Sequence, residues 1–229
     1  MAWGSAPQNV TTGTLTSGSI TIAPVASGTT AAPTLLVIYL CNTAGSGTNT
    51  ITETGQTWTL LADSTASGSS RSAIYTRVCT TAATLSIAIT MGSGASTATV
   101  IYEEWTGSGS TLLQDGSGSF AYSNTSVSNT SSVTSGTLAI TPTVTGDLLL
   151  SSCVTGTGTA QTYTATNLTK SASSVIGKGV SGYTVGPAAT TVTPQWAFAA
   201  TRPYAATVAV VKQTVISTSN TSSGFMVCI

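Results

Sequence analysis

Apolar and polar positions alternate along much of this 229-residue chain, with the period of two that is typical of β-strands. Leu85, Ile87 and Ile89 would share one face of such a strand, with threonine, serine and alanine on the other. Residues 34–41 are apolar almost throughout, which predicts a central strand covered on both faces. No window carries a 3.6-residue apolar period with caps, so the pattern favours an all-β protein.

Short β-branched runs, separated by clusters of glycine, serine, proline and asparagine, predict strands in both halves of the chain. In the first half we expect them at residues 18–23, 34–41, 57–62, 72–79, 83–90 and 98–105. In the second half we expect them at residues 136–141, 147–154, 161–165, 174–180, 190–197 and 205–213. Short strands with frequent turn signals between them indicate β-sandwiches.

The two halves also share short matching segments in the same order, which indicates an internal duplication. The matches pair residues 16–18 with 134–136, 35–37 with 148–150, 56–59 with 161–164, 82–84 with 188–190, and 98–100 with 206–208. The offset changes in stretches rich in Gly, Ser, Thr and Ala, as expected for surface loops that tolerate insertions. We therefore predict two tandem repeated antiparallel β-sandwich units of jelly-roll or immunoglobulin-like type. They would be either separate or merged into one larger sandwich.

The limits of the repeats set the predicted domain organisation. An N-terminal arm is expected at residues 1–14, and the first β-sandwich unit at residues 15–106. A connector rich in Ser, Gly and Asn follows at residues 107–132. The second unit is expected at residues 133–213, and a C-terminal tail at residues 214–229.

Charged residues make up only 5% of the chain, against about 25% in a typical globular protein. The formal net charge is zero, so there is no basic excess to attract nucleic acid or an anionic membrane surface, and we expect neither as a partner. No apolar run reaches the roughly 18 residues of a membrane span, and the N-terminus does not read as a signal peptide. A charge near zero favours self-association, which fits a subunit of an assembly or a secreted protein.

The chain offers little for catalysis. It has no histidine, which is the usual base of serine and cysteine hydrolases, and it has neither a Gly-x-Ser-x-Gly elbow nor a phosphate-binding loop. The only adjacent carboxylates, Glu103 and Glu104, would point to opposite faces of a strand and could not flank one glycosidic bond. We therefore expect no catalytic residues and a protein that is not an enzyme. The alternative is a glycosidase whose two catalytic carboxylates come from different strands.

The four cysteines are Cys41, Cys79, Cys153 and Cys228. The first three end or sit within apolar strand-like runs, so we expect buried free thiols, with one or two disulfides as the alternative. Because no Cys-x-x-Cys pair and no histidine is present, we predict neither a metal site nor a cofactor site.

Two pairs of residues occupy matching positions in the two halves. Trp58 and Tyr163 are expected in the cores of their units, whereas a solvent-facing pair would indicate sugar stacking. Arg77 and Lys178 are expected on a solvent face or edge, where charge discourages edge pairing. The alternative is an ion pair between units or subunits with one of three acids, Glu103, Glu104 or Asp147.

Both ends of the chain lie outside the repeats and carry apolar side chains that would be a liability if free. We expect these side chains to dock on a neighbouring subunit or to add a strand to one. The predicted subunit contacts are Trp3 near the N-terminus and Phe225, Met226, Val227 and Ile229 at the C-terminus.

Several segments together resemble a known group of proteins. A Leu-Leu-Val strand precedes a Thr-Trp-Thr strand, an Ile-Tyr strand that ends in a basic residue, and Glu-Glu-Trp-Thr-Gly at residues 103–107. The second half opens with Gly-Asp-Leu-Leu-Leu at residues 146–150 and closes at residues 208–212. Over residues 15–213 this pattern resembles the duplicated Thr/Ala/Gly-rich β-sandwich proteins encoded by tailed phages and bacterial genomes. The resemblance implies a structural role in a virion or at a cell surface, not a named activity.

These features lead us to expect a bacteriophage virion structural protein, either a capsid decoration subunit or a head or tail accessory subunit. Its expected location is the virion, and its expected partners are other virion proteins and further copies of itself. A carbohydrate- or receptor-binding module, with a glycan as partner, is the main alternative. A glycosidase is the third.

Overall fold

The computed structural model shows an all-β protein whose strands pair antiparallel. It describes residues 3–7, 9–15, 19–22, 25–26, 34–42, 49–66, 70–80, 83–92, 98–106, 111–118, 132–133, 139–142, 146–156, 161–173, 179–187, 189–198 and 204–214. Within these ranges no residue lies in a helix, so none of the described segments is a helix that could span a membrane.

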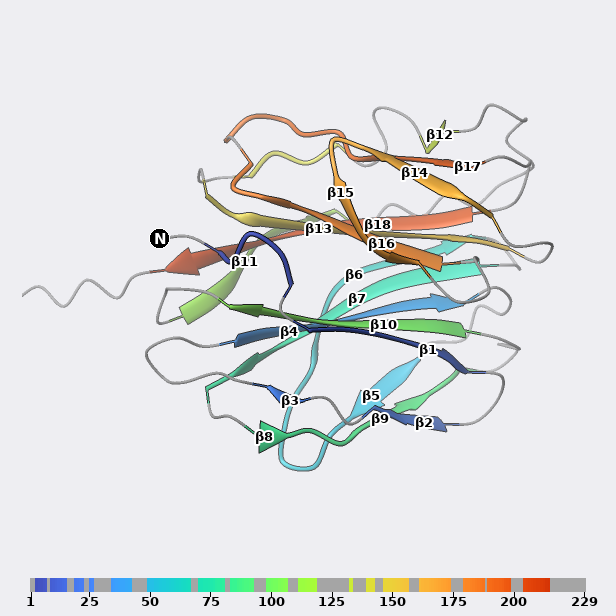
Figure 1. Cartoon of the computed structure of the whole chain (residues 1–229), viewed down its shortest axis with the longest axis vertical. Helices are drawn as coiled ribbons and strands as arrows, with labels where there is room; N and C mark the ends of the chain where they lie inside the picture. Colours follow the sequence, from blue (N-terminus) through green and yellow to red (C-terminus); the bar gives the residue numbers. More distant parts are fainter. Residues whose placement is uncertain are drawn as a thin grey trace, which may run out of the picture.

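The strands form four stacked layers (Figure 1). Two five-stranded sheets, here called inner sheet 1 and inner sheet 2, face each other in the middle of the molecule. Smaller sheets, outer sheet 1 and outer sheet 2, cover the faces that the inner sheets turn away from each other.

Each inner sheet contains strands from one half of the chain. Inner sheet 1 has the order β1-β10-β4-β7-β6, which are Asn9–Leu15, Ala98–Thr106, Thr34–Asn42, Ser70–Cys79 and Thr59–Ala66. Inner sheet 2 has the order β11-β18-β13-β16-β15, which are Thr111–Gly118, Tyr204–Thr214, Leu148–Thr155, Gly179–Val185 and Thr169–Ser173.

The outer sheets are built from shorter strands. Outer sheet 1 has the order β2-β9-β5, which are Ser19–Ile22, Ile87–Thr90 and Thr50–Thr52. The two-stranded ribbon β3-β8, Val25–Ala26 with Ala83–Thr84, lies in the same layer (Figure 1). Outer sheet 2 has the order β12-β17-β14, which are Ser132–Val133, Gln195–Phe198 and Tyr163–Thr166.

The apolar run that predicts a central strand forms β4, in the middle of inner sheet 1, and all nine of its residues are buried. Leu35 and Val37 face inner sheet 2, whereas Leu36 and Ile38 face outer sheet 1. Both faces are therefore apolar because both are covered, and this prediction is confirmed.

Three large hydrophobic cores of described residues lie between the four layers, and a small fourth cluster of Cys41, Val154 and Ala205 joins the inner sheets. The central core, between the two inner sheets, includes Leu35, Trp105, Leu148 and Tyr183. One outer core lies beneath outer sheet 1 and another beneath outer sheet 2. The ring of Trp105 meets that of Tyr183 edge-on, with centroids 4.7 Å apart, so aromatic side chains from both halves pack in the central core.

The order of strands is the same in the two halves of the chain. Taken in sequence, β1, β4, β6, β7 and β10 occupy the places in inner sheet 1 that β11, β13, β15, β16 and β18 occupy in inner sheet 2. The outer sheets correspond in the same way, β2-β9-β5 with β12-β17-β14. The ribbon β3-β8 has no counterpart among the described residues.

Two edge strands lie in segments that were predicted to fall outside the two units. β1 falls almost entirely within the predicted N-terminal arm, residues 1–14, and β11 lies within the predicted connector, residues 107–132. Both segments therefore belong to the inner sheets. An edge strand covered on one side needs few large apolar residues, so the hydrophobic pattern gave little sign of either.

Two predicted strands in the second half also differ from the structure. Within residues 136–141, the described part contains only an isolated bridge between Ile140 and Val192. Of the strand expected at 174–180, residues 174–178 lie outside the described residues and the rest falls in β16, Gly179–Val185, whereas the preceding strand β15 was not predicted. Because β15 is a Thr-Lys-Ser-Ala-Ser segment with a register shift, it carries no apolar alternation that could have indicated it.

Candidate functional site

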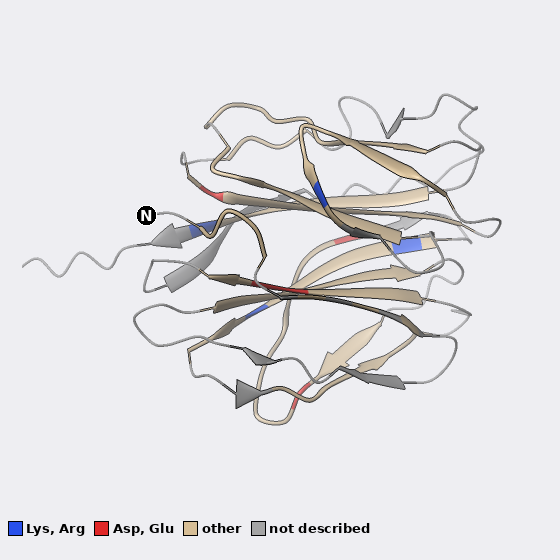
Figure 2. Ribbon diagram, viewed as in Figure 1, with Lys and Arg blue, Asp and Glu red and all other residues tan. Residues whose placement is uncertain are grey.

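Charged residues are few along the ribbon (Figure 2), and most of those whose burial is described are buried. Glu103, Glu104 and Asp147 are at most 2% exposed, and Arg71 and Arg77 are at most 9% exposed. Lys170, by contrast, is exposed to solvent. Among the residues whose burial is described, few charges therefore reach the surface, so the candidate sites considered are polar hollows and buried clusters.

The turn after β5 forms a polar cluster at the rim of outer sheet 1. Glu53 accepts hydrogen bonds from Arg77 Nη2 at 2.8 Å and from Trp58 Nε1 at 3.0 Å. Arg77 Nη1 also donates to Gln56 Oε1 at 3.0 Å. Gly55 sits in this turn with φ +72°, a conformation that glycine adopts without strain. The cluster thus holds the turn against β7.

A hollow of about 470 Å³ adjoins this cluster and is lined by Thr52, Glu53, Thr54, Ser86 and Ala88. The Glu53 carboxylate lines it but is already engaged by Arg77 and Trp58. This hollow therefore offers little beyond hydrogen bonding.

Glu104 lies on the same face of β10 as Tyr102, whose hydroxyl donates to Glu104 Oε1 at 2.8 Å. Burial and the neighbouring Glu104 carboxylate raise the pKa of Tyr102 above its ordinary value, so the phenol stays a protonated donor. Glu103, the next residue along the strand, faces the opposite side. The prediction that these two carboxylates point to opposite faces of a strand is confirmed.

The corresponding rim of outer sheet 2 carries the larger hollow, here called the Thr184 hollow. Leu36 on β4 and Leu149 on β13 are matched positions of the two halves. Leu36 pairs with Arg77, beside the first hollow, and Leu149 pairs with Thr184, in the second, so the two hollows occupy corresponding places. Thr184 Oγ1 donates to the Asn167 carbonyl at 2.8 Å, where the first rim has an arginine instead.

The Thr184 hollow has a volume of about 620 Å³ and a neutral wall. Its lining residues are Asn167, Leu168, Thr169, Thr184, Pro187, Thr191, Val192 and Thr193. Asn167 has φ +59° and donates from Nδ2 to the Thr193 carbonyl at 3.0 Å, which fixes the turn between β14 and β15. Five of these residues carry hydroxyl or amide groups and three are apolar, a mixture that suits an uncharged molecule with both polar and apolar faces, such as a sugar.

Glu103 occupies a sealed position between the inner sheets. Its carboxylate accepts hydrogen bonds from Tyr39 at 3.1 Å, Trp105 at 3.0 Å, Ser181 at 2.9 Å and Ser171 at 2.5 Å. Burial raises its pKa above the ordinary value, although these four donors act in the opposite direction. Because Glu103 is fully buried and its donors come from both inner sheets, it joins the sheets and cannot reach a ligand.

Three hydroxyl groups form a second polar contact between the inner sheets. Ser72 Oγ lies 2.6 Å from Ser152 Oγ and 3.0 Å from Thr207 Oγ1, and the last two lie 2.8 Å apart. Nearby, burial raises the pKa of Cys41 to about 12, so its thiol stays protonated and unreactive. These groups also serve packing.

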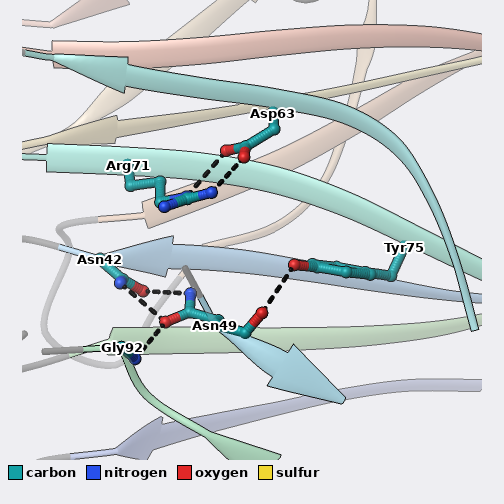
Figure 3. Close-up of polar contacts among 6 residues, drawn as sticks. All are labelled: Asn42, Asn49, Asp63, Arg71, Tyr75 and Gly92. Atoms are coloured by element: carbon teal, nitrogen blue, oxygen red, sulfur yellow. Dashed lines mark hydrogen bonds and ion pairs between the residues drawn. The ribbon is translucent and has the colours of Figure 1, made fainter. Parts of the chain in front are cut away.

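A further cluster fixes the opposite end of β4 (Figure 3). Asn42 and Asn49 exchange side-chain hydrogen bonds of 3.2 and 3.1 Å, and Tyr75 donates to the Asn49 carbonyl at 3.2 Å. Arg71 and Asp63 form a two-pronged ion pair beside them. The cluster ties the start of β5 to inner sheet 1, which is a structural role.

The structure places the predicted subunit contacts differently from expectation or leaves them undescribed. Trp3 is 4% exposed and packs in the central core of its own chain, so its side chain offers no surface to a neighbour. The C-terminal residues Phe225, Met226, Val227 and Ile229 lie outside the described residues.

Trp58 and Tyr163, matched by sequence, lie in different elements: Trp58 precedes β6 of inner sheet 1, and Tyr163 begins β14 of outer sheet 2. Tyr163 is buried in an outer core, as predicted, and Trp58 is partly buried against the outer core of its own half. Arg77 is not on a solvent face but is buried, and its ion-pair partner is Glu53, not one of the three acids considered. Lys178 lies outside the described residues.

Cys41, Cys79 and Cys153 are buried free thiols, as predicted, and Cys228 lies outside the described residues. Among the residues that the structure describes, no group of three or more Cys, Asp or Glu side chains could hold a metal ion. The Thr184 hollow was not predicted, and Asn167 in a turn-forming Thr-Asn-Leu segment was its only sequence signal. Comparison of the chain with protein-family models, curated proteins and solved structures gave no match.

Proposed function

We propose that this chain is a structural subunit of a tailed-phage particle, serving as a capsid decoration protein or as a head or tail accessory protein. Its partners are other virion proteins and further copies of itself, and it carries out no catalysis. The observation that carries this proposal is the scarcity of exposed charge: five of the charged residues are at most 9% exposed. A free protein relies on surface charge for colloidal repulsion, whereas a packed subunit does not.

We also infer that the two halves are copies of one sandwich unit, merged through their inner sheets into one body. The matching strand orders support this inference, because a shared order of eight strands is hard to reach independently. In each half an inner and an outer sheet form one unit. The central core then corresponds to a fused interface between the two copies.

The test of the proposal is the composition of the particle itself. Particles of the phage that encodes the chain would be purified on a density gradient and analysed by quantitative mass spectrometry. We expect the chain at a fixed ratio to the major capsid or tail protein. A high-salt wash should not change this ratio, because few exposed charges form contacts that salt could screen. Recovery of the chain only in the soluble lysate would contradict the proposal.

A carbohydrate- or receptor-binding module is the second candidate, and the Thr184 hollow favours it. Its neutral wall of threonine, asparagine and apolar side chains matches an uncharged saccharide, although no aromatic side chain is among its described lining residues. Saturation-transfer NMR with a panel of neutral oligosaccharides would test it, comparing Thr193→Val with Thr52→Val in the other hollow. Transfer that is lost only in Thr193→Val would support glycan binding, and no transfer to the unaltered protein would contradict it.

A further inference from the structure

The edge strands of the inner sheets differ in their protection against pairing with another chain. An edge strand presents unpaired N–H and C=O groups that can template a new strand, and proteins block this with bulges, charges or short edges. The edges in question are β1 and β6 of inner sheet 1 and β11 and β15 of inner sheet 2.

Three of these four edges carry both a register irregularity and a charged residue. In β6 the register shifts after Leu60, and the strand contains Asp63. In β15 it shifts after Lys170, which is itself exposed. In β11 it shifts after Gln114, next to Asp115. Each device discourages a further strand from joining.

β1 has neither device. It pairs with β10 in unbroken register from Asn9 to Leu15, and its sequence, Asn-Val-Thr-Thr-Gly-Thr-Leu, contains no charge and no proline. At seven residues it is longer than the edge strands of the outer sheets, which have two to four. Val10 is 40% exposed, and within the described part of the chain β1 pairs only with β10.

We propose that β1 is an interface strand that pairs antiparallel with β1 of a second copy of this chain, so that inner sheet 1 continues across a twofold axis. This inference deepens the proposed function and rests on it, since it specifies how one assembly subunit contacts another. Pairing centred on Thr12 sets Thr12 against its own copy and Val10 against Thr14 of the second copy. Such Thr–Thr and β-branched pairs stabilise antiparallel ladders, and no like charges oppose each other.

Two exposed apolar residues on opposite edges of the same sheet provide a matched test. Val10 on β1 is 40% exposed and Leu60 on β6 is 41% exposed, so replacing either with lysine exchanges similar apolar surface for one charge. Sedimentation velocity of the full-length chain would measure the association of Val10→Lys, Leu60→Lys and the unaltered protein. Thermal unfolding by circular dichroism would establish that each variant is folded.

We expect the unaltered chain to be a dimer, Val10→Lys to weaken association about tenfold or more, and Leu60→Lys to leave it unchanged. A monomer at the highest attainable concentration, or a dimer that Val10→Lys does not weaken, would overturn the proposal. A chain truncated after Asn220 is the third comparison. If it dissociates as Val10→Lys does, the C-terminal tail occupies the edge, and pairing between two β1 strands is wrong.

Hydrogen exchange of the unaltered chain tests the same idea without a variant. Protection of the residue 9–15 amides should rise with protein concentration, because alternate amides of β1 face away from β10 and gain partners only in the dimer. Protection that is independent of concentration would overturn the pairing. A chain that dimerises through β1 but is absent from purified particles would instead leave this inference standing and remove the proposed function.

Discussion

At the scale of single residues, the chain places its scarce charges where they join segments. Glu103 accepts hydrogen bonds from Tyr39 and Trp105 of inner sheet 1 and from Ser171 and Ser181 of inner sheet 2. Buried polar groups of this kind stabilise a fold only while every partner is satisfied. Glu103 is therefore a structural residue whose removal should be felt across the whole molecule.

Replacing Glu103 with leucine should lower the free energy of unfolding by about 2–4 kcal/mol, because four buried donors lose their acceptor. Glu103→Gln keeps one acceptor oxygen and should cost less. Urea denaturation followed by tryptophan fluorescence measures both. The control is Thr164→Ala on an exposed position of β14, expected within about 0.5 kcal/mol of the unaltered chain. Equal stability of Glu103→Leu and this control would refute the role of Glu103.

Glu103 should also make stability depend on pH. Burial raises its pKa in the folded protein above the ordinary value of 4.5, so the folded state holds the proton more tightly than the unfolded state. Its stabilising contribution is complete below the unfolded pKa and is lost as the pH rises through the folded pKa. The unaltered chain should therefore lose stability relative to Glu103→Gln as the pH rises above about 4.5. A pH-independent difference in urea denaturation would contradict this.

At the scale of elements, sequence predicted those strands whose environment imposes a pattern. β4 was predicted because two covered faces demand continuous apolar residues, and β9 because Ile87 and Ile89 alternate with less buried positions. β1, β11 and β15 escaped prediction because edges impose no such demand. The similarity of residues 56–59 to 161–164 wrongly indicated that the two segments hold matching places. A short Thr-rich match does not determine which sheet a segment joins.

The candidate site was less predictable than the fold. Arg77 meets Glu53 only because the turn after β5 folds over β7, a contact across 24 positions that no local pattern reports. The Thr184 hollow likewise brings together Asn167 and Thr193, which are 26 positions apart. Threonine is so common in this chain that those lining a hollow do not stand out in sequence.

The turn between β14 and β15 depends on the left-handed conformation of Asn167, φ +59°. The Asn167→Ala variant should have a free energy of unfolding about 1 kcal/mol lower than Asn167→Gly. Both variants lose the hydrogen bond to the Thr193 carbonyl, but only alanine strains the backbone. Thermal unfolding of Asn167→Ala and Asn167→Gly provides the comparison. If alanine equals or exceeds glycine in stability, the turn does not impose this conformation in solution.

At the scale of the whole molecule, the two halves share one central core. Leu35 and Trp105 from one half pack with Leu148 and Tyr183 from the other, and neither inner sheet could leave this face bare in water. The two halves should therefore unfold together. Structures of this kind are built from stacked layers around shared cores, and here four layers enclose three large cores.

Urea unfolding should accordingly be a single transition when it is followed separately in each half. Trp58 reports on the first half and Trp196, buried beneath outer sheet 2, reports on the second. Two variants are needed, one that keeps only Trp58 and one that keeps only Trp196, with the other tryptophans replaced by phenylalanine. The fluorescence curves of the two variants should share one midpoint. Two separated midpoints would show that the halves are independent units joined only by the chain.

We propose that the protein is packed among its own copies and other virion proteins in a phage particle. A cryo-EM reconstruction of that particle at side-chain resolution tests it most directly. We predict four-layered density for this chain at regular lattice positions on the head or at a fixed level of the tail, with its weakly charged surface against neighbouring subunits. Particles in which every position is filled by other proteins, while this chain remains free in the lysate, would contradict the claim.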